Sequence, residues 1–175
     1  PALAAQWDAE KNGILTPQDV SARSTRAVWW QCKLGHTWKT TVVQRTLHGE
    51  ECPYCSNRTV LPGFNDLATI APQIAKQWHP LLNDLLKPEN VLAVSEKPVW
   101  WQCPEGHVWR SKIRERVEQG QQPRCPICEG DTSRIKRCAR LIRLTYQQLG
   151  ITPLQQRGRG RKGRLAEDPQ PPPVL

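Results

Sequence analysis

Apolar and polar positions along the first 130 residues repeat one pattern of short segments. Each copy begins with a short apolar stretch, ALAAQW at residues 2–7 and QIAKQW at residues 73–78, which predicts a helical turn. VWWQC then predicts a strand, LGH a tight turn, and HTWKTTVV, which is rich in β-branched residues, a returning strand over residues 36–43. Thr16 is expected to cap a further helical turn that has Pro17 at its first position. The pattern predicts a small α+β unit built on a hairpin.

The same unit occurs a second time, 71 residues further along the chain. VWWQCKLGHTW, which begins at residue 28, becomes VWWQCPEGHVW at residue 99. The match extends from Trp7 and Trp78 to Arg45 and Arg116, and the eight tryptophans divide four to each copy. Self-similarity at a fixed period indicates a tandem duplication. We place the repeats at residues 1–60 and 61–130, a helix at 131–150 and a tail at 151–175.

Residues 131–150 carry a different pattern, in which apolar residues recur at helical spacing. The apolar residues are Ile135, Cys138, Ala139, Ile142, Tyr146 and Leu149. The basic residues around them are Arg134, Lys136, Arg137, Arg140 and Arg143. The pattern predicts an amphipathic helix. Three roles are open to it: docking on the second repeat with a solvated basic face, contact with nucleic acid, or contact with a protein partner.

The composition limits the core that such units can bury. Hydrophobic residues make up 38% of the chain, there is one Phe, and the mean hydropathy is -0.63. Domains of roughly 60 residues with so little apolar surface usually need a metal or disulfides. The first residues show no signal peptide, and no stretch approaches the roughly 20 apolar residues of a membrane span. We therefore expect an intracellular chain with reduced thiols, whose patterned cysteines bind metal.

Six of the seven cysteines form two quartets with two histidines. In each quartet Cys-x3-His lies at the hairpin turn and Cys-x2-Cys follows it. The quartets are Cys32, His36, Cys52 and Cys55, and Cys103, His107, Cys125 and Cys128. Three thiolates and an imidazole complete a tetrahedral Zn²⁺ site without an open position, which is typical of structural zinc. The alternatives are core cysteines or a redox pair, and a water or neighbouring residue in place of either histidine.

The paired tryptophans allow two roles. Neighbouring side chains on a strand point to opposite faces, so one of Trp29 and Trp30 is expected to face the zinc core. The other is expected to face outward or to pack on the helix of Trp7. The rings either substitute for a larger core or leave one ring to stack on an unpaired base, a contact worth roughly 1–3 kcal/mol. Cys138 is expected to be buried on the C-terminal helix, and His79 to be an ordinary surface or packing residue.

The order of these motifs resembles a known family. Pro-x-x-Ala-x-x-Trp, Thr-Pro-x-Asp-Val, Val-Trp-Trp-x-Cys, Gly-His-x-Trp and Cys-Pro-x-Cys are similar, over residues 1–130, to the zinc-ribbon family of treble-clef zinc fingers. The resemblance implies a knuckle, a β-hairpin and a short helix around each zinc, with the two quartets as ligands. The family occurs in tandem in microbial genomes, sometimes joined to very-short-patch-repair-like endonuclease domains, and implies nucleic-acid binding only loosely. The first copy lacks a counterpart of residues 61–71.

Positive charge is concentrated in the last quarter of the chain. Of the net charge of +9, residues 131–175 account for +7, with 10 basic and 3 acidic side chains. The Gly-spaced basic residues of QQRGRGRKGR predict a disordered Arg-Gly tail that attracts polyanions. These residues are Arg157, Arg159, Arg161, Lys162 and Arg164. The stretch resembles an AT-hook, with Gly160 where that motif has Pro, so duplex DNA is favoured. RNA binding and a solvated tail are the alternatives.

The sequence therefore predicts a small α+β protein whose fold is stabilised by bound metal ions. It has two tandem treble-clef zinc-binding repeats with two structural Zn²⁺ ions, a basic helix and a disordered Arg-Gly tail. We expect a non-enzymatic, zinc-dependent nucleic-acid-binding accessory or recruiting protein that prefers DNA to RNA. We expect it to be cytoplasmic, and nucleoid-associated if bacterial. The alternative is a protein–protein adaptor whose repeats and helix dock a larger complex. The sequence has no catalytic triad, phosphate loop or paired-carboxylate pattern, and we expect neither a membrane nor a small-molecule substrate as partner.

Overall fold

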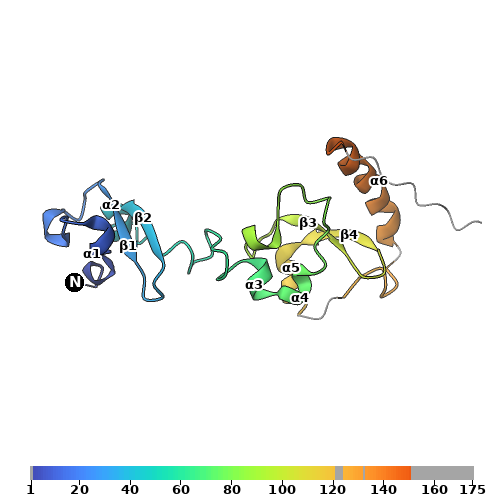
Figure 1. The fold of residues 1–175 in the computed structure, drawn as a ribbon, viewed down its shortest axis with the longest axis horizontal. Coiled ribbons are helices and arrows are strands. Elements are labelled where there is room, and N and C mark those ends of the chain that lie inside the picture. The colour runs from blue at the N-terminus through green and yellow to red at the C-terminus, as the bar shows by residue number, and fades with distance from the viewer. Residues whose placement is uncertain (1, 121–123, 132, 151–175) are drawn as a thin grey trace, which may run out of the picture.

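The chain forms two small α+β units in succession, followed by a longer helix (Figure 1). The structure is a computed structural model that describes residues 2–120, 124–131 and 133–150. The two units are joined by the stretch between α2 and α3, and the helix α6 (Ser133–Gln148) follows the second unit. We refer to the units as repeat 1 and repeat 2.

Repeat 1 is a hairpin with short helical turns before and after it. Its elements are the 3-10 turns η1 (Ala4–Gln6) and η2 (Pro17–Asp19), the helices α1 (Ala9–Asn12) and α2 (Val42–Thr46), and the strands β1 (Ala27–Gln31) and β2 (Thr37–Thr41). The strands pair antiparallel, with Trp29 opposite Lys39 and Trp30 opposite Trp38. Thr16 closes η2 as predicted, because its N–H and hydroxyl both donate to the carboxylate of Asp19.

Repeat 2 keeps the 3-10 turn, hairpin and closing helix of repeat 1, has the extra helix α3 at its start, and has a turn at residues 80–83, where repeat 1 has α1. Its elements are α3 (Leu67–Ile70), α4 (Pro72–Ala75), η3 (Pro88–Asn90), β3 (Pro98–Gln102), β4 (Val108–Lys112) and α5 (Ile113–Glu118). The register of the hairpin repeats that of repeat 1, with Trp100 opposite Arg110 and Trp101 opposite Trp109. Helix α3 belongs to the segment for which repeat 1 has no counterpart. It adds the fully buried Leu67 to the second core.

The returning strand of repeat 1 is shorter than the sequence predicts. The β-branched run favours a strand to residue 43, but α2 begins at Val42. Thr41 has an extended backbone and its hydroxyl accepts a hydrogen bond from the N–H of Gln44, which caps the helix. The helix buries Val42 and Arg45, three residues apart on one face. The cap and this burial override the weak strand preference of the two valines.

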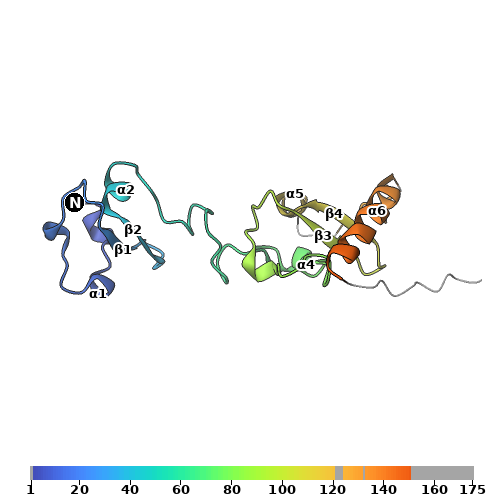
Figure 2. The ribbon, with the colours of Figure 1, turned by 90° about the horizontal axis from the view of Figure 1, so that it is seen from above.

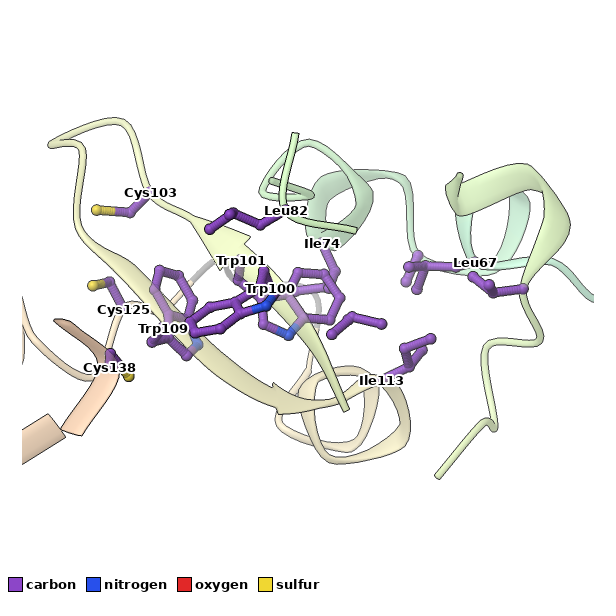
Figure 3. Close-up of a cluster of buried hydrophobic side chains, with 13 residues drawn as sticks. Leu67, Ile74, Leu82, Trp100, Trp101, Cys103, Trp109, Ile113, Cys125 and Cys138 are labelled. Carbon is purple, nitrogen blue, oxygen red and sulfur yellow. The ribbon is translucent and has the colours of Figure 1, made fainter. Parts of the chain in front are cut away.

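The two cores differ in size although their hairpins match. In repeat 1 the buried cluster is Val28, Trp30, Trp38, Val42 and Cys52. In repeat 2 it also draws on α3, α4 and α6, and the rings of Trp100, Trp101 and Trp109 lie at its centre (Figure 3). Of Trp29 and Trp30, one enters the core as expected: Trp30 is buried, and Trp29 is half-buried. In repeat 2 both Trp100 and Trp101 are buried.

The ring that enters the core is also the one that meets the N-terminal turn. Trp30 contacts Trp7 edge to face, with ring centroids 5.6 Å apart, and Trp101 meets Trp78 in the same way at 5.7 Å. In repeat 1 the alternation of side chains along the strand predicts instead that these two contacts belong to different members of the pair. In repeat 1 one face of the hairpin carries the core tryptophan, whereas in repeat 2 the ring of Trp100 on the opposite face is buried as well.

Helix α6 docks on repeat 2, beside the β3–β4 hairpin (Figure 2). Cys138 is buried as predicted, and Ile142 and Tyr146 pack against the same apolar cluster. The predicted apolar face is only partly correct, because Ile135 and Ala139 are exposed. The buried stripe of α6 therefore begins at Cys138.

Candidate metal centres

Each metal centre is assembled from two tight turns. In repeat 1 the first turn lies between β1 and β2, where the N–H of Cys32 donates to the carbonyl of His36 and the N–H of Gly35 to the carbonyl of Cys32. Gly35 has φ +82°, a conformation that favours glycine. In the second turn the N–H of Ser56 donates to the carbonyl of Cys52. These turns point four ligand atoms at one another.

The four ligand atoms of repeat 1 lie at the spacings of a coordination tetrahedron. Sγ of Cys32 and Sγ of Cys55 are 3.8 Å apart. Nδ1 of His36 lies 3.3 Å from Sγ of Cys55 and 3.8 Å from Sγ of Cys52. The predicted quartet is therefore brought together completely, and Nδ1 is the histidine nitrogen that faces the sulfurs.

Repeat 2 reproduces the site. Nδ1 of His107 lies 3.6 Å from Sγ of Cys103, 3.8 Å from Sγ of Cys125 and 3.2 Å from Sγ of Cys128. Sγ of Cys103 and Sγ of Cys128 are 4.0 Å apart. Cys103 and Cys125 belong to the apolar cluster and lie at one end of it, next to Trp109 (Figure 3). The metal centre therefore closes one end of the core.

Both sites fit structural zinc. Zn–S bonds of about 2.3 Å and Zn–N bonds of about 2.0–2.1 Å give a tetrahedron with S···S edges of about 3.8 Å and N···S edges of about 3.6 Å. The observed separations match these edges, and within each quartet all ligand atoms lie within 4.8 Å of one another. Both sites are Cys3His sites suitable for Zn²⁺, as the sequence predicts. The cation would complete the fold of each repeat, and the ligand set fills its four positions.

The crowded thiols explain why a cation is needed. Burial raises the pKa of Cys55 to about 12, together with the nearby thiols of Cys52 and Cys32. The pKa of Cys128 is likewise raised to about 12, first by its contact with Cys125 and then by burial. Burial alone would raise the pKa of Cys32, but backbone N–H groups outweigh it and lower that pKa. A divalent cation supplies the positive charge that allows the remaining thiols to ionise.

A buried arginine braces the core beside each metal centre. The guanidinium of Arg45 lies 5.4 Å from the ring centroids of Trp30 and Trp38, and Arg116 lies 5.8 and 5.6 Å from those of Trp101 and Trp109. Burial lowers the pKa of both arginines. Arg45 and Arg116 align in the sequence, but no role is predicted for them there. Their recurrence at the same position of both copies is the feature that could have indicated a structural role.

The segment between the repeats also supports the first metal centre. The ring of Phe64 packs edge to face on His36, with centroids 4.2 Å apart, and Tyr54 meets the same imidazole at 5.7 Å. Neither contact is predictable from the sequence, since no spacing rule connects residues 36 and 64. They hold the imidazole in the orientation that points Nδ1 at the thiols.

The predicted nucleic-acid-binding residues are only partly within the described structure. Arg140 and Arg143 are exposed on α6. The side chains of three helix residues and the whole tail lie outside the described residues. They are Arg134, Lys136 and Arg137 on the helix, and Arg157, Arg159, Arg161, Lys162 and Arg164 in the tail.

Two Cys3His centres on knuckle, hairpin and short helix define a tandem zinc-finger protein. A family model described as a probable treble clef zinc finger domain matches residues 3–58 and again residues 74–131. These matches cover more than half of the chain, so the chain belongs to that family. A search of curated proteins finds no match. In the described residues, no helix has the length and apolar character needed to span a bilayer.

Proposed function

We propose that this zinc-finger protein is a non-enzymatic accessory or recruiting factor that binds nucleic acid, with DNA preferred to RNA. The observation that carries the proposal is a set of cations at equivalent exposed positions of both repeats. Arg26 and Lys39 in repeat 1 correspond to Lys97 and Arg110 in repeat 2, and all four side chains are exposed. Among the described residues none of the four is in an ion pair.

Unpaired cations at repeated positions suit a ligand with repeated negative charge. A nucleic-acid backbone supplies phosphates at regular spacing, and neutralising them releases counterions. Helix α6, which packs on repeat 2, adds two further exposed cations, Arg140 and Arg143. A non-enzymatic role is supported by ligand sets that fill all four positions of each metal and leave none for a reactive water. Loss of zinc would abolish binding, because the hairpins carry the cations.

A salt titration of DNA binding tests the proposal. The test variant replaces Arg26, Lys39, Lys97 and Arg110 with alanine. The control variant removes four exposed cations that already have carboxylate partners: Arg58, Lys112, Arg114 and Arg124. Both variants lose the same net charge. We expect the test variant to bind duplex DNA at least about tenfold more weakly, with a salt slope reduced by roughly 2–4, and the control to change far less. Equal losses would mean that only net charge matters and would refute the assigned surface.

A second candidate function is the protein–protein adaptor. Ile14 and Leu85 occupy equivalent positions in the two repeats and are exposed to 101% and 83%. An exposed apolar side chain at the same position of both repeats could contribute to a docking contact. The adaptor function predicts a stable partner complex that survives high salt and is weakened when both residues become Ser. Failure of every nucleic-acid probe to bind near physiological salt would favour it over the first proposal.

A further inference from the structure

Along each hairpin strand, the side chains that alternate with the core residues form an outer face. The two repeats differ in what covers this face. In repeat 2 Trp100 lies on this face, is 4% exposed, and belongs to the apolar cluster that α6 joins through Tyr146. In repeat 1 the equivalent Trp29 is half-buried and does not belong to the core cluster. Among the described residues, repeat 1 has no helix equivalent to α6. Trp29 therefore presents an aromatic ring at the surface.

The surroundings of Trp29 are polar at positions where repeat 2 is apolar. Lys11 stands at the position of Leu82, which is 4% exposed in the second core. Thr37 stands at the position of Val108, which packs against that core, and Lys11 Nζ donates to the Thr37 hydroxyl. An apolar helix docked here would have to bury an ammonium and a hydroxyl at a desolvation cost. The face therefore lacks the chemistry of a second helix-docking surface.

Cations surround the ring instead. Lys11 Nζ lies 4.9 Å from the ring centroid of Trp29, and Lys39 stands directly opposite Trp29 across the hairpin. Both residues, with Arg26, line a hollow of about 570 Å³ beside the ring. Asp19 also lines it and remains negatively charged, because the hydroxyl and N–H of Thr16, and the charge of Arg26, lower its pKa; the three cations still outnumber it. The hollow thus combines an aromatic surface with an excess of positive charge.

We propose that this hollow binds an unpaired nucleobase stacked on Trp29, with the adjoining phosphates held by Lys11, Arg26 and Lys39. Aromatic rings within basic grooves bind single strands because every base has a π-face, whereas the bases of a duplex are already stacked on one another. The side chain of Lys11 is 43% exposed and its ammonium lies 4.0 Å from the carboxylate of Asp8, so this loose ion pair would open as the ammonium swings from the ring to a phosphate. The inference rests on the proposed nucleic-acid binding and adds single-stranded nucleic acid, with unpaired bases, as a ligand.

The fold does not depend on this ring. The backbone of Trp29 is held by Asn12, whose side-chain oxygen accepts from the Trp29 N–H at 2.9 Å and whose amide donates to the Trp29 carbonyl at 2.8 Å. Both bonds survive removal of the indole. A Trp29→Ala variant is therefore expected to keep its zinc and its hairpin.

The test uses the full zinc-loaded chain and three labelled probes. These are an oligothymidylate of about ten nucleotides, within the site sizes of single-strand binders, an abasic strand with the same number of phosphates, and a duplex. We expect Trp29→Ala to weaken oligothymidylate binding roughly tenfold or more, and Trp29→Phe to restore most of it. Binding of the abasic strand and the duplex should hardly change. Lys33→Ala is the charge control, since Lys33 is exposed and lines a different hollow. It should have little effect, whereas Lys11→Ala should weaken oligothymidylate binding.

The outcomes separate the two proposals. If the wild-type chain binds none of the probes, the nucleic-acid function fails and the Trp29 site fails with it. If the chain binds oligothymidylate but Trp29→Ala, shown to retain zinc and its melting temperature, binds it equally well, only the Trp29 site is refuted. The same holds if Trp29→Ala weakens the abasic and thymidylate strands equally, or if an acidic peptide displaces the thymidylate strand at comparable concentration.

Discussion

Replacing Arg116 with alanine removes a positive charge from the interior of repeat 2. The side chain is 2% exposed. Its Nη1 donates to Oε1 of Gln119 at 2.9 Å and its Nη2 to Oε1 of Gln77 at 2.6 Å. The guanidinium also lies between the rings of Trp101 and Trp109. The substitution thus removes two hydrogen bonds and two ring contacts and leaves a cavity.

The expected loss of unfolding free energy follows from these contacts. A hydrogen bond with a charged partner contributes about 1.5–3 kcal/mol, and a cation–π contact about 0.5–2 kcal/mol. The gross stabilisation is therefore about 4–10 kcal/mol. Desolvation of the guanidinium, which lowers the pKa of Arg116, costs several kcal/mol of this. We expect a net loss of about 3 kcal/mol for Arg116→Ala, a large part of the roughly 5–15 kcal/mol that stabilises a domain. Arg116→Lys should lose about half as much, because an ammonium lacks the planar fork.

Urea unfolding at fixed excess zinc, followed by tryptophan emission, measures the loss. The control is Arg114→Ala, because Arg114 is exposed and its ion pairs with Glu96 and Glu118 are at the surface. Such pairs are worth about 0–1 kcal/mol. A loss below about 1 kcal/mol for Arg116→Ala, with zinc still bound, would refute the bracing role. An equally stable Arg116→Met variant would show that the side chain acts by its volume and not by its charge.

Two further predictions concern metal and pH. Removing zinc with a chelator should shift tryptophan emission to the red and abolish cooperative unfolding, because structural zinc contributes about 10–16 kcal/mol; unchanged emission after confirmed zinc loss would contradict the structural role. Burial lowers the pKa of His79, whose Nδ1 accepts from the N–H groups of Leu81 and Leu82. This contribution to stability is complete above the unfolded pKa of about 6.5 and falls as pH drops toward the lowered folded pKa. His79→Asp, which copies Asp8 of repeat 1, should therefore lose less melting temperature between pH 7.5 and pH 5.5 than the wild type, as measured by calorimetry; parallel losses would contradict this.

Local patterns in the sequence predicted the metal centres almost completely. Cys32 and His36 flank one turn, and Cys52 and Cys55 flank another, so the spacing alone nearly fixes their geometry. The duplication then confirmed each assignment against its copy. The short helical turns and the strands were also predictable, since Thr16, Pro17 and the VWWQC segments act through neighbours in sequence. The end of β2 was not, because the burial of Arg45 on α2 depends on the packed core.

Contacts between distant segments could not be predicted. Trp100 shares its apolar cluster with residues of α6, which lies more than 30 residues away in sequence, whereas the equivalent Trp29 lies in a different environment. The contact of Phe64 with His36 depends likewise on how the segment between the repeats folds back. His79 was expected to be an ordinary surface or packing residue. It is buried, and the hydrogen bonds that its ring accepts from Leu81 and Leu82 become visible only in the structure.

The segment between the repeats determines how the protein would engage a ligand with two points of attachment. Asn65 accepts from the N–H of Leu61 and donates to the carbonyls of Tyr54 and Thr59, while its own carbonyl accepts from Ala93 in repeat 2. A flexible tether would let the two repeats adapt to many distances between contact points on a ligand. Each binding event would then cost the entropy of ordering the tether. A tether fixed at both ends gives the second module a high effective concentration at one spacing and almost none at others. On the proposed nucleic-acid-binding function, the tandem repeat would select ligands by the distance between their two contact points.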